Sequence, residues 1–305
     1  MVDVKYLFYC IIDPIIAMIG ILGNSMCLII YAKFSTKDNT FEYQIAIAVV
    51  DLVCISAKLF HWMSYWWIAI GHRDGEAWIQ YYPILVWYNE HMSGFLRFGT
   101  DTLLPLLTMV MCINRATAMY IPTSYQRIRK PVFVIGTVSS FLAAGTVNSM
   151  HLFRSVITNG TSLRISINNA AVSVGIAEAQ LIARDIITVF AVLVVATLNI
   201  FILKRYRSTT RIAGRAHTTR KNTKDDKLKI TLLVVQSVLV VLGQVPLAID
   251  FYIKYSLPHL DIDILHDLAT FGVTVEASLN FLAYVGTSGW FRAAFCKTFL
   301  FCFRF

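Results

Sequence analysis

Several ionisable side chains occur inside stretches that are otherwise apolar, and they are the first candidates for chemistry. Arg97 and Asp101 are four residues apart, so a helix would present both on one face, where they can pair with each other. If Arg97 instead binds a small molecule, its guanidinium suits an anionic or hydrogen-bond-accepting group. Other charged, imidazole and aromatic candidates for the same binding site fall at similar depth or nearer the ends of neighbouring apolar stretches: Lys58, His61, Trp66, Arg184, Asp185 and Asp250. Aromatic belts at a membrane interface are the alternative explanation for some of the aromatic residues.

A second polar set consists of Asn24, Asp51 and Asn280, each in a different apolar stretch. An ionisable side chain in a membrane is costly unless it faces the bundle interior and has partners, so we expect these three residues to meet. Glu276 precedes Asn280 by one helical turn and is expected nearby, where the two acids can share a proton rather than both ionise. The alternative is a polar contact that only holds helices together.

The residue patterns do not indicate an enzyme or a metal site. The seven histidines are dispersed, no HExxH pattern occurs, and no nucleophile can be matched to a base. Of the six cysteines only Cys10 falls near an expected outer surface, so no extracellular disulfide framework is expected.

The polar residues described above must be positioned by membrane-spanning helices. The chain has 305 residues, of which 57% are hydrophobic and 15% charged, against about 25% charged residues in a soluble domain. Its mean hydropathy is +0.62. Residues 132–150, 186–203 and 230–249 carry no ionisable side chain, and about 20 such residues suffice for a helix to cross a bilayer. Lipid is therefore the expected solvent.

Seven spans are predicted, and together they form one all-α transmembrane domain over residues 1–305. Their expected limits are 7–32, 42–70, 83–120, 131–153, 179–204, 228–254 and 266–288. The third is the least clear, because Glu90, Arg97 and Asp101 interrupt it. We retain it because the following residues are strongly apolar.

The distribution of basic residues orients the bundle. With the N-terminus outside, nineteen Lys and Arg residues fall in the inner segments and five in the outer segments, as the positive-inside rule requires. The N-glycosylation sequon that begins at Asn159 then lies in an outer loop. Because the basic residues sit between hydrophobic spans, the net charge of +9 indicates topology and not nucleic-acid binding.

Short motifs in five of the spans resemble those of the rhodopsin-like receptor superfamily. Each is weak alone, and their order along the chain carries the resemblance. The matching segments are Gly23-Asn24, residues 46–51 ending in Asp51, Asn114-Arg115 followed by Pro122 and Tyr125, Pro246 in the sixth span, and residues 280–284 from Asn280 to Tyr284.

This chain also departs from the superfamily pattern. Glu90 stands where a disulfide cysteine is usual, Asn114 replaces the acid beside the arginine, and Gln244 stands at the usual tryptophan before Pro246. Such degenerate motifs resemble the nematode serpentine chemoreceptors of the Srg/Srv-like group. A missing acid at Asn114 implies weaker restraint of the inactive state by Arg115, and raised basal activity.

The resemblance implies a G-protein-coupled receptor that binds a small extracellular ligand in the outer half of the bundle. It implies a heterotrimeric G protein as the inner partner, arrestin as a further partner, and a location in the plasma membrane, including that of a sensory cilium. Arg115, Pro122 and Tyr125 would face the G protein, and Asp51 would lie at a sodium or proton site. Pro246 removes a backbone hydrogen bond and would kink the sixth span as a pivot or as a static bend.

The segment 289–305 is aromatic and basic, and is expected to form an amphipathic helix on the inner membrane face. Cys296 and Cys302 are candidate palmitoylation sites there, or ordinary thiols. A seven-helix transporter or ligand-gated channel is the alternative to a receptor. It would require a pair of broken helices or a continuous polar stripe through the bundle.

Overall fold

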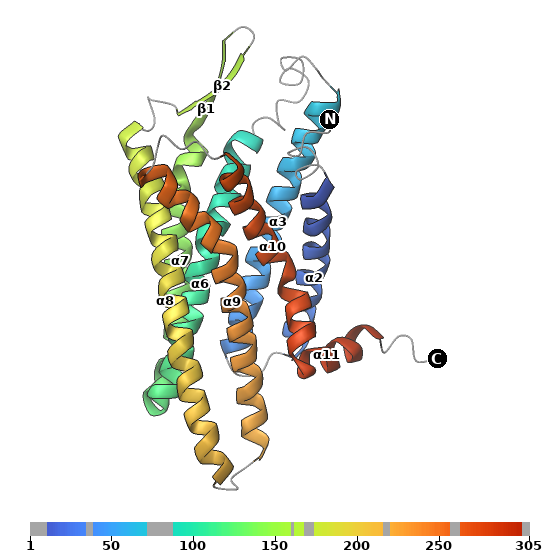
Figure 1. The fold of residues 1–305 in the computed structure, drawn as a ribbon, viewed down its shortest axis with the longest axis vertical. Helices are drawn as coiled ribbons and strands as arrows, with labels where there is room; N and C mark the ends of the chain where they lie inside the picture. The colour runs from blue at the N-terminus through green and yellow to red at the C-terminus, as the bar shows by residue number, and fades with distance from the viewer. Residues whose placement is uncertain are drawn as a thin grey trace.

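The computed structural model describes residues 11–34, 39–71, 88–159, 162–167, 174–215, 220–256 and 263–300. Within these residues, seven helices are long and apolar enough to cross a membrane. They are α2 (Asp13–Phe34), α3 (Asn39–Gly71), α6 (Gly94–Tyr120), α7 (Pro122–Asn148), α8 (Val174–Arg215), α9 (Arg220–Ser256) and α10 (Asp263–Thr287). All seven pack side by side in one bundle (Figure 1), which confirms the predicted fold class.

The short elements distinguish the two ends of the bundle. Next to the N-terminal end of α2, the π-helix η2 (Tyr88–Ser93) leads into α6, and the 3₁₀ helix η3 (Ser149–Phe153) follows α7. The antiparallel hairpin of β1 (Arg154–Asn159) and β2 (Ser162–Ile167) rises beyond that end. At the other end α10 turns into α11 (Gly289–Phe295) and η4 (Cys296–Leu300) (Figure 1). The charge bias makes the hairpin end the outer one.

The hairpin was not predicted from the sequence, although the signal is present. Residues 162–167 alternate polar and branched or apolar side chains, the pattern of a half-buried strand. A six-residue alternation is easily overlooked in a chain whose main signal is a series of long apolar segments. Asn159 is the last residue of β1 and pairs with Ser162.

Polar and small residues lie between the helices together with buried apolar ones, and many other large apolar residues face outward. Ile135 and Leu142 on α7 are 68% and 66% exposed, which is the expected state of a lipid-facing side chain. Between helices, small residues allow close approach. A Cβ atom at Gly243 on α9 would overlap the Glu276 side chain on α10, so glycine at this position permits the contact between the two helices.

Aromatic rings attach α11 to the inner end of the bundle. Ser288 begins the helix by accepting a hydrogen bond from the Phe291 backbone N–H at 3.2 Å. The fully buried Phe291 ring then lies 5.9 Å from the ring of Tyr31 on α2. It also lies 5.7 Å from Tyr284 and 5.9 Å from Phe281 on α10. This cluster fixes the direction in which the chain leaves α10.

Replacing Phe291 with alanine should therefore destabilise the inner end. A buried Phe→Ala change costs about 3–5 kcal/mol in a well-packed core, so a clear fall in Tm is expected for the detergent-purified protein. Phe201→Ala provides a control, because Phe201 is 48% exposed on α8. Equal Tm values for the two variants would contradict the structural role of the ring cluster.

Candidate functional site

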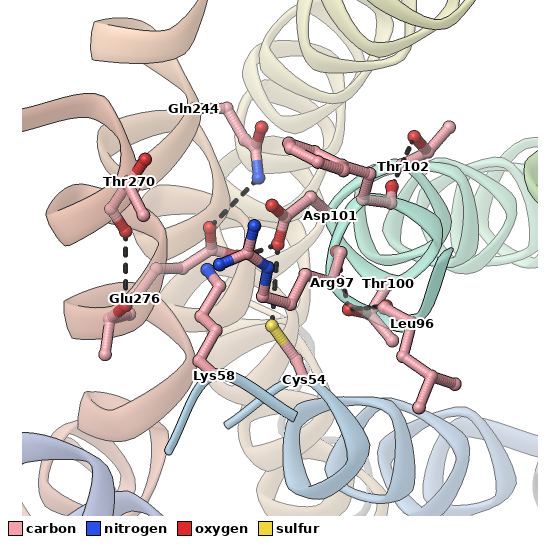
Figure 2. Close-up of polar contacts among 12 residues, drawn as sticks. Cys54, Lys58, Leu96, Arg97, Thr100, Asp101, Thr102, Gln244, Thr270 and Glu276 are labelled. Carbon is pink, nitrogen blue, oxygen red and sulfur yellow. Dashed lines mark hydrogen bonds and ion pairs between the residues drawn. The ribbon is translucent and has the colours of Figure 1, made fainter. Parts of the chain in front are cut away.

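A buried ion pair connects α3 and α6 in the outer half of the bundle. The Lys58 ammonium lies 3.3 Å from a carboxylate oxygen of Asp101, and the two side chains are 1% and 14% exposed. The Cys54 thiol, one turn before Lys58 on α3, donates to the same oxygen at 3.5 Å. Figure 2 shows the Arg97 guanidinium with its charged end toward this pair. From the sequence, Asp101 was expected to pair with Arg97. In the structure, Lys58 is a second cation beside the Asp101 carboxylate.

Glu276 extends this set of charges to α9 and α10. Its carboxylate accepts a hydrogen bond from the Gln244 amide at 3.4 Å, and both side chains are at most 2% exposed. Figure 2 shows the carboxylate facing the ends of Lys58, Arg97 and Asp101. We call Lys58, Arg97, Asp101, Gln244 and Glu276 the outer charge cluster. It joins α3, α6, α9 and α10 and contains two formal cations and two formal anions.

A second polar layer lies one turn further along α10. Asn280 donates to the Asp51 carboxylate at 2.5 Å, and Asn24 donates to the backbone oxygens of Ala277 at 2.7 Å and Gly20 at 3.1 Å. All three side chains are at most 2% exposed. Asn24 thus joins α2 to the backbone of α10, whereas the Asp51–Asn280 bond joins α3 to α10. Glu276, one turn before Asn280, makes its hydrogen bond to Gln244.

Oxygen atoms in this layer suit a small hard cation. One side-chain oxygen of Asp51, Asn24, Asn280 and Ser278 is in each case buried without a hydrogen-bond partner. Hard cations prefer carboxylate, amide and hydroxyl oxygens. The residues present therefore supply the kinds of ligand atom that a sodium site near Asp51 would need.

A third polar layer surrounds Tyr284, one further turn along α10. The Tyr284 hydroxyl lies 2.7 Å from the amide oxygen of Gln44 on α3 and 2.6 Å from that of Gln236 on α9. All three side chains are at most 2% exposed. We call Gln44, Gln236 and Tyr284 the inner amide cluster. The sequence motifs contain only Tyr284, and the two glutamines could have been noticed only as amides within long apolar runs.

The inner mouth of the bundle contains the Asn114 motif. Asn114 donates to the Tyr125 hydroxyl at 3.4 Å, which joins α6 to α7. Arg115 is half-buried beside it, and Pro122 is exposed at the first turn of α7. Where rhodopsin-like receptors usually have an acid that can pair with the arginine, this chain has Asn114, and its amide contacts the Tyr125 hydroxyl.

One of the remaining candidates, Arg184, shares the Phe98 ring with Arg97. Arg184 and Asp185 on α8 pair with each other at 2.6 Å, and the Arg184 guanidinium lies 5.0 Å from the ring centre of Phe98. His61 on α3 and Asp250 on α9 are half-buried toward the outer end. Cys296 is exposed in η4. Cys302 and the side chains of Trp66 and Asn159 lie outside the described residues.

No protein-family model matches this sequence, and no curated protein matches it significantly. Among solved structures, the chain is similar to the crystal structure of squid rhodopsin, with a TM-score of 0.67 and 15% identity. The alignment covers 100% of this chain and 88% of the rhodopsin chain. The chain therefore has a rhodopsin-like seven-helix fold and is a multi-pass membrane protein.

The outer charge cluster predicts a strong coupling between Lys58 and Asp101. Lys58→Met and Asp101→Asn each leave buried charge without its partner, and such changes cost about 3–5 kcal/mol. Asp101→Asn should be the worse of the two, because it removes the carboxylate toward which both the Lys58 ammonium and the charged end of Arg97 point. The double variant should recover part of the lost stability, measured as the Tm of the purified protein. Strictly additive losses would show that the two charges do not interact.

Proposed function

We propose that this chain is a G-protein-coupled receptor whose extracellular ligand acts on the outer charge cluster. The observation that carries the proposal is the contact between Gln244 and Glu276 within a rhodopsin-like fold. Gln244 stands two residues before Pro246, the helix-interior proline of α9. A change in the charges around Glu276 therefore acts directly beside the position where α9 can bend.

The proposed mechanism is a shift between two bundle conformations. A ligand that pairs with Arg97, Lys58 or Asp101 changes the electrostatic field at the Glu276 carboxylate. This change alters the strength of the hydrogen bond between Gln244 and Glu276. If the ligand favours the conformation in which α9 bends outward at Pro246, its binding raises the population of that conformation. The opened inner end would then present Arg115 to a heterotrimeric G protein. His61, Trp66, Arg184, Asp185 and Asp250 are the further candidates for contacts with the ligand.

The finer assignments are also proposals. The motif pattern favours a chemosensory receptor similar to the Srg/Srv-like group, in the plasma membrane and in sensory cilia, with arrestin as a second inner partner. Asn159 would carry a glycan on the outer hairpin. Exposed Cys296, on the helical segment after α10, would be palmitoylated together with Cys302.

A transporter or channel is the second candidate function, and one observation favours it. Glu276, Asn280 and Tyr284 recur every four residues along α10, so buried polar groups form a stripe on one helix face. A stripe of this kind can conduct ions or protons in other membrane proteins. The first experiment below therefore includes a flux measurement.

Nucleotide exchange separates the two functions. Membranes containing the chain are tested against a panel of Gα proteins, and basal exchange above empty membranes is expected because Asn114 replaces the restraining acid. Arg115→Ala should lower this exchange at least about tenfold if Arg115 contacts the G protein, since one lost charged contact is worth about 1.5–3 kcal/mol. Arg127→Ala, on the exposed inner face of α7, should leave it unchanged. Ion or solute flux without exchange on any Gα would contradict the receptor proposal.

A sodium site at Asp51 predicts an ion-specific effect on basal exchange. Replacing choline chloride by sodium chloride at constant ionic strength should lower exchange, because a cation held between α2, α3 and α10 favours the closed bundle. Asp51→Asn keeps the shape of the side chain but removes its charge, and should abolish the difference between the two salts. An equal sodium effect in wild type and variant would place the cation elsewhere.

A further inference from the structure

The inner amide cluster lies where movement of α9 would be largest. Gln236 precedes Pro246 by ten residues, about 15 Å along the helix toward its inner end. Gln44 is in the second turn of α3, and Tyr284 is in the last turn of α10. A small bend of α9 at Pro246 would therefore move Gln236 a large distance away from α3 and α10, because these two helices do not bend with it.

The hydrogen-bond chemistry requires that the three residues act together. The Tyr284 hydroxyl has one hydrogen, so it can donate to only one of the two amide oxygens near it. The other glutamine must turn its amide and donate to the hydroxyl oxygen. Gln236 can do so, because its Nε2 atom is buried without a hydrogen-bond partner, whereas Gln44 Nε2 contacts the Met111 sulfur at 3.5 Å. In the resulting chain of hydrogen bonds, the Gln236 amide donates to the Tyr284 hydroxyl, and this hydroxyl donates to the Gln44 amide oxygen.

The surroundings of the cluster make these bonds costly to break. Buried apolar side chains such as Ile30 and Leu232 pack around it, so a separated amide would find few other polar groups, the Tyr31 hydroxyl among them. The Tyr284 ring is also held against Tyr31 and Phe291, at centroid distances of 6.1 and 5.7 Å. Tyr284 is therefore held in place by ring packing. When α9 moves, it is the Gln236–Tyr284 hydrogen bond that must break.

We propose that Gln44 and Gln236 are positioning residues that use Tyr284 to hold the inner end of α9 against α3 and α10 in the inactive bundle. No sequence motif assigned a role to either glutamine. The link is a separate restraint from the one at Asn114, because Asn114 bonds Tyr125 and joins α6 to α7, whereas the link joins α9 to α3 and α10. Its role in signalling rests on the proposed receptor function, whereas its effect on helix position does not.

The experiment measures helix position and signalling separately. Spin labels at Thr123→Cys on α7 and Lys227→Cys on α9, with Cys10, Cys296 and Cys302 replaced by serine, report the distance between the inner ends. Gln236→Leu and Tyr284→Phe should each increase the long-distance population several-fold and raise basal nucleotide exchange by a similar factor. Combining Gln44→Leu with Gln236→Leu should add little to Gln236→Leu alone, because Gln236→Leu has already removed the bond that holds α9 to Tyr284.

Thr197→Val provides the control, because the Thr197 hydroxyl is exposed and bonds only the backbone of its own helix at Leu193. It should change neither readout. A longer distance without exchange on any Gα would support the link and contradict the receptor function. Folded Gln236→Leu and Tyr284→Phe proteins with a wild-type distance distribution would overturn the link, even if their Tm fell.

Discussion

Hydrocarbon offers no water to a polar group, and this constraint organises the interior of the bundle. A charge such as Lys58 can remain there only if another helix brings a partner, and Asp101 does so at 3.3 Å. The same requirement draws Glu276 to Gln244 and Asp51 to Asn280. Each contact joins different helices, so satisfying the polar groups also fixes which helix faces meet.

Along helix α10, buried polar side chains find partners on neighbouring helices at three successive positions. Glu276, Asn280 and Tyr284 are four residues apart and face the interior in succession, one in each polar layer. The outer layer contacts α9 near its proline, the middle layer contacts α3, and the inner layer contacts both. The three layers thus share one helix, α10, and Asn24 joins α2 to the same helix through its backbone.

Much of the fold follows from the sequence because lipid makes hydrophobicity decisive. Uncharged stretches such as 186–203 can only be buried in a bilayer, and the charge bias orients them. The partners of the site residues were harder to predict. Glu276 was placed with Asn280 by helical spacing, but its hydrogen bond goes to α9, and spacing within one helix cannot show which neighbour it faces. Gln44 and Gln236 were missed because they carry no charge and belong to none of the receptor motifs.

The ring cluster around Phe291 has a consequence for how the molecule sits in its bilayer. The helix α11 runs across the inner end and is packed against α2 and α10, so an α11 that lies on the inner membrane face would fix the level of the lipid surface there. A thicker or thinner membrane cannot be accommodated at that side without detaching the rings. Mismatch in thickness would therefore be absorbed by tilt of the helices and at their outer ends, close to the outer charge cluster. Membrane thickness would then act on the half of the bundle that contains the outer charge cluster.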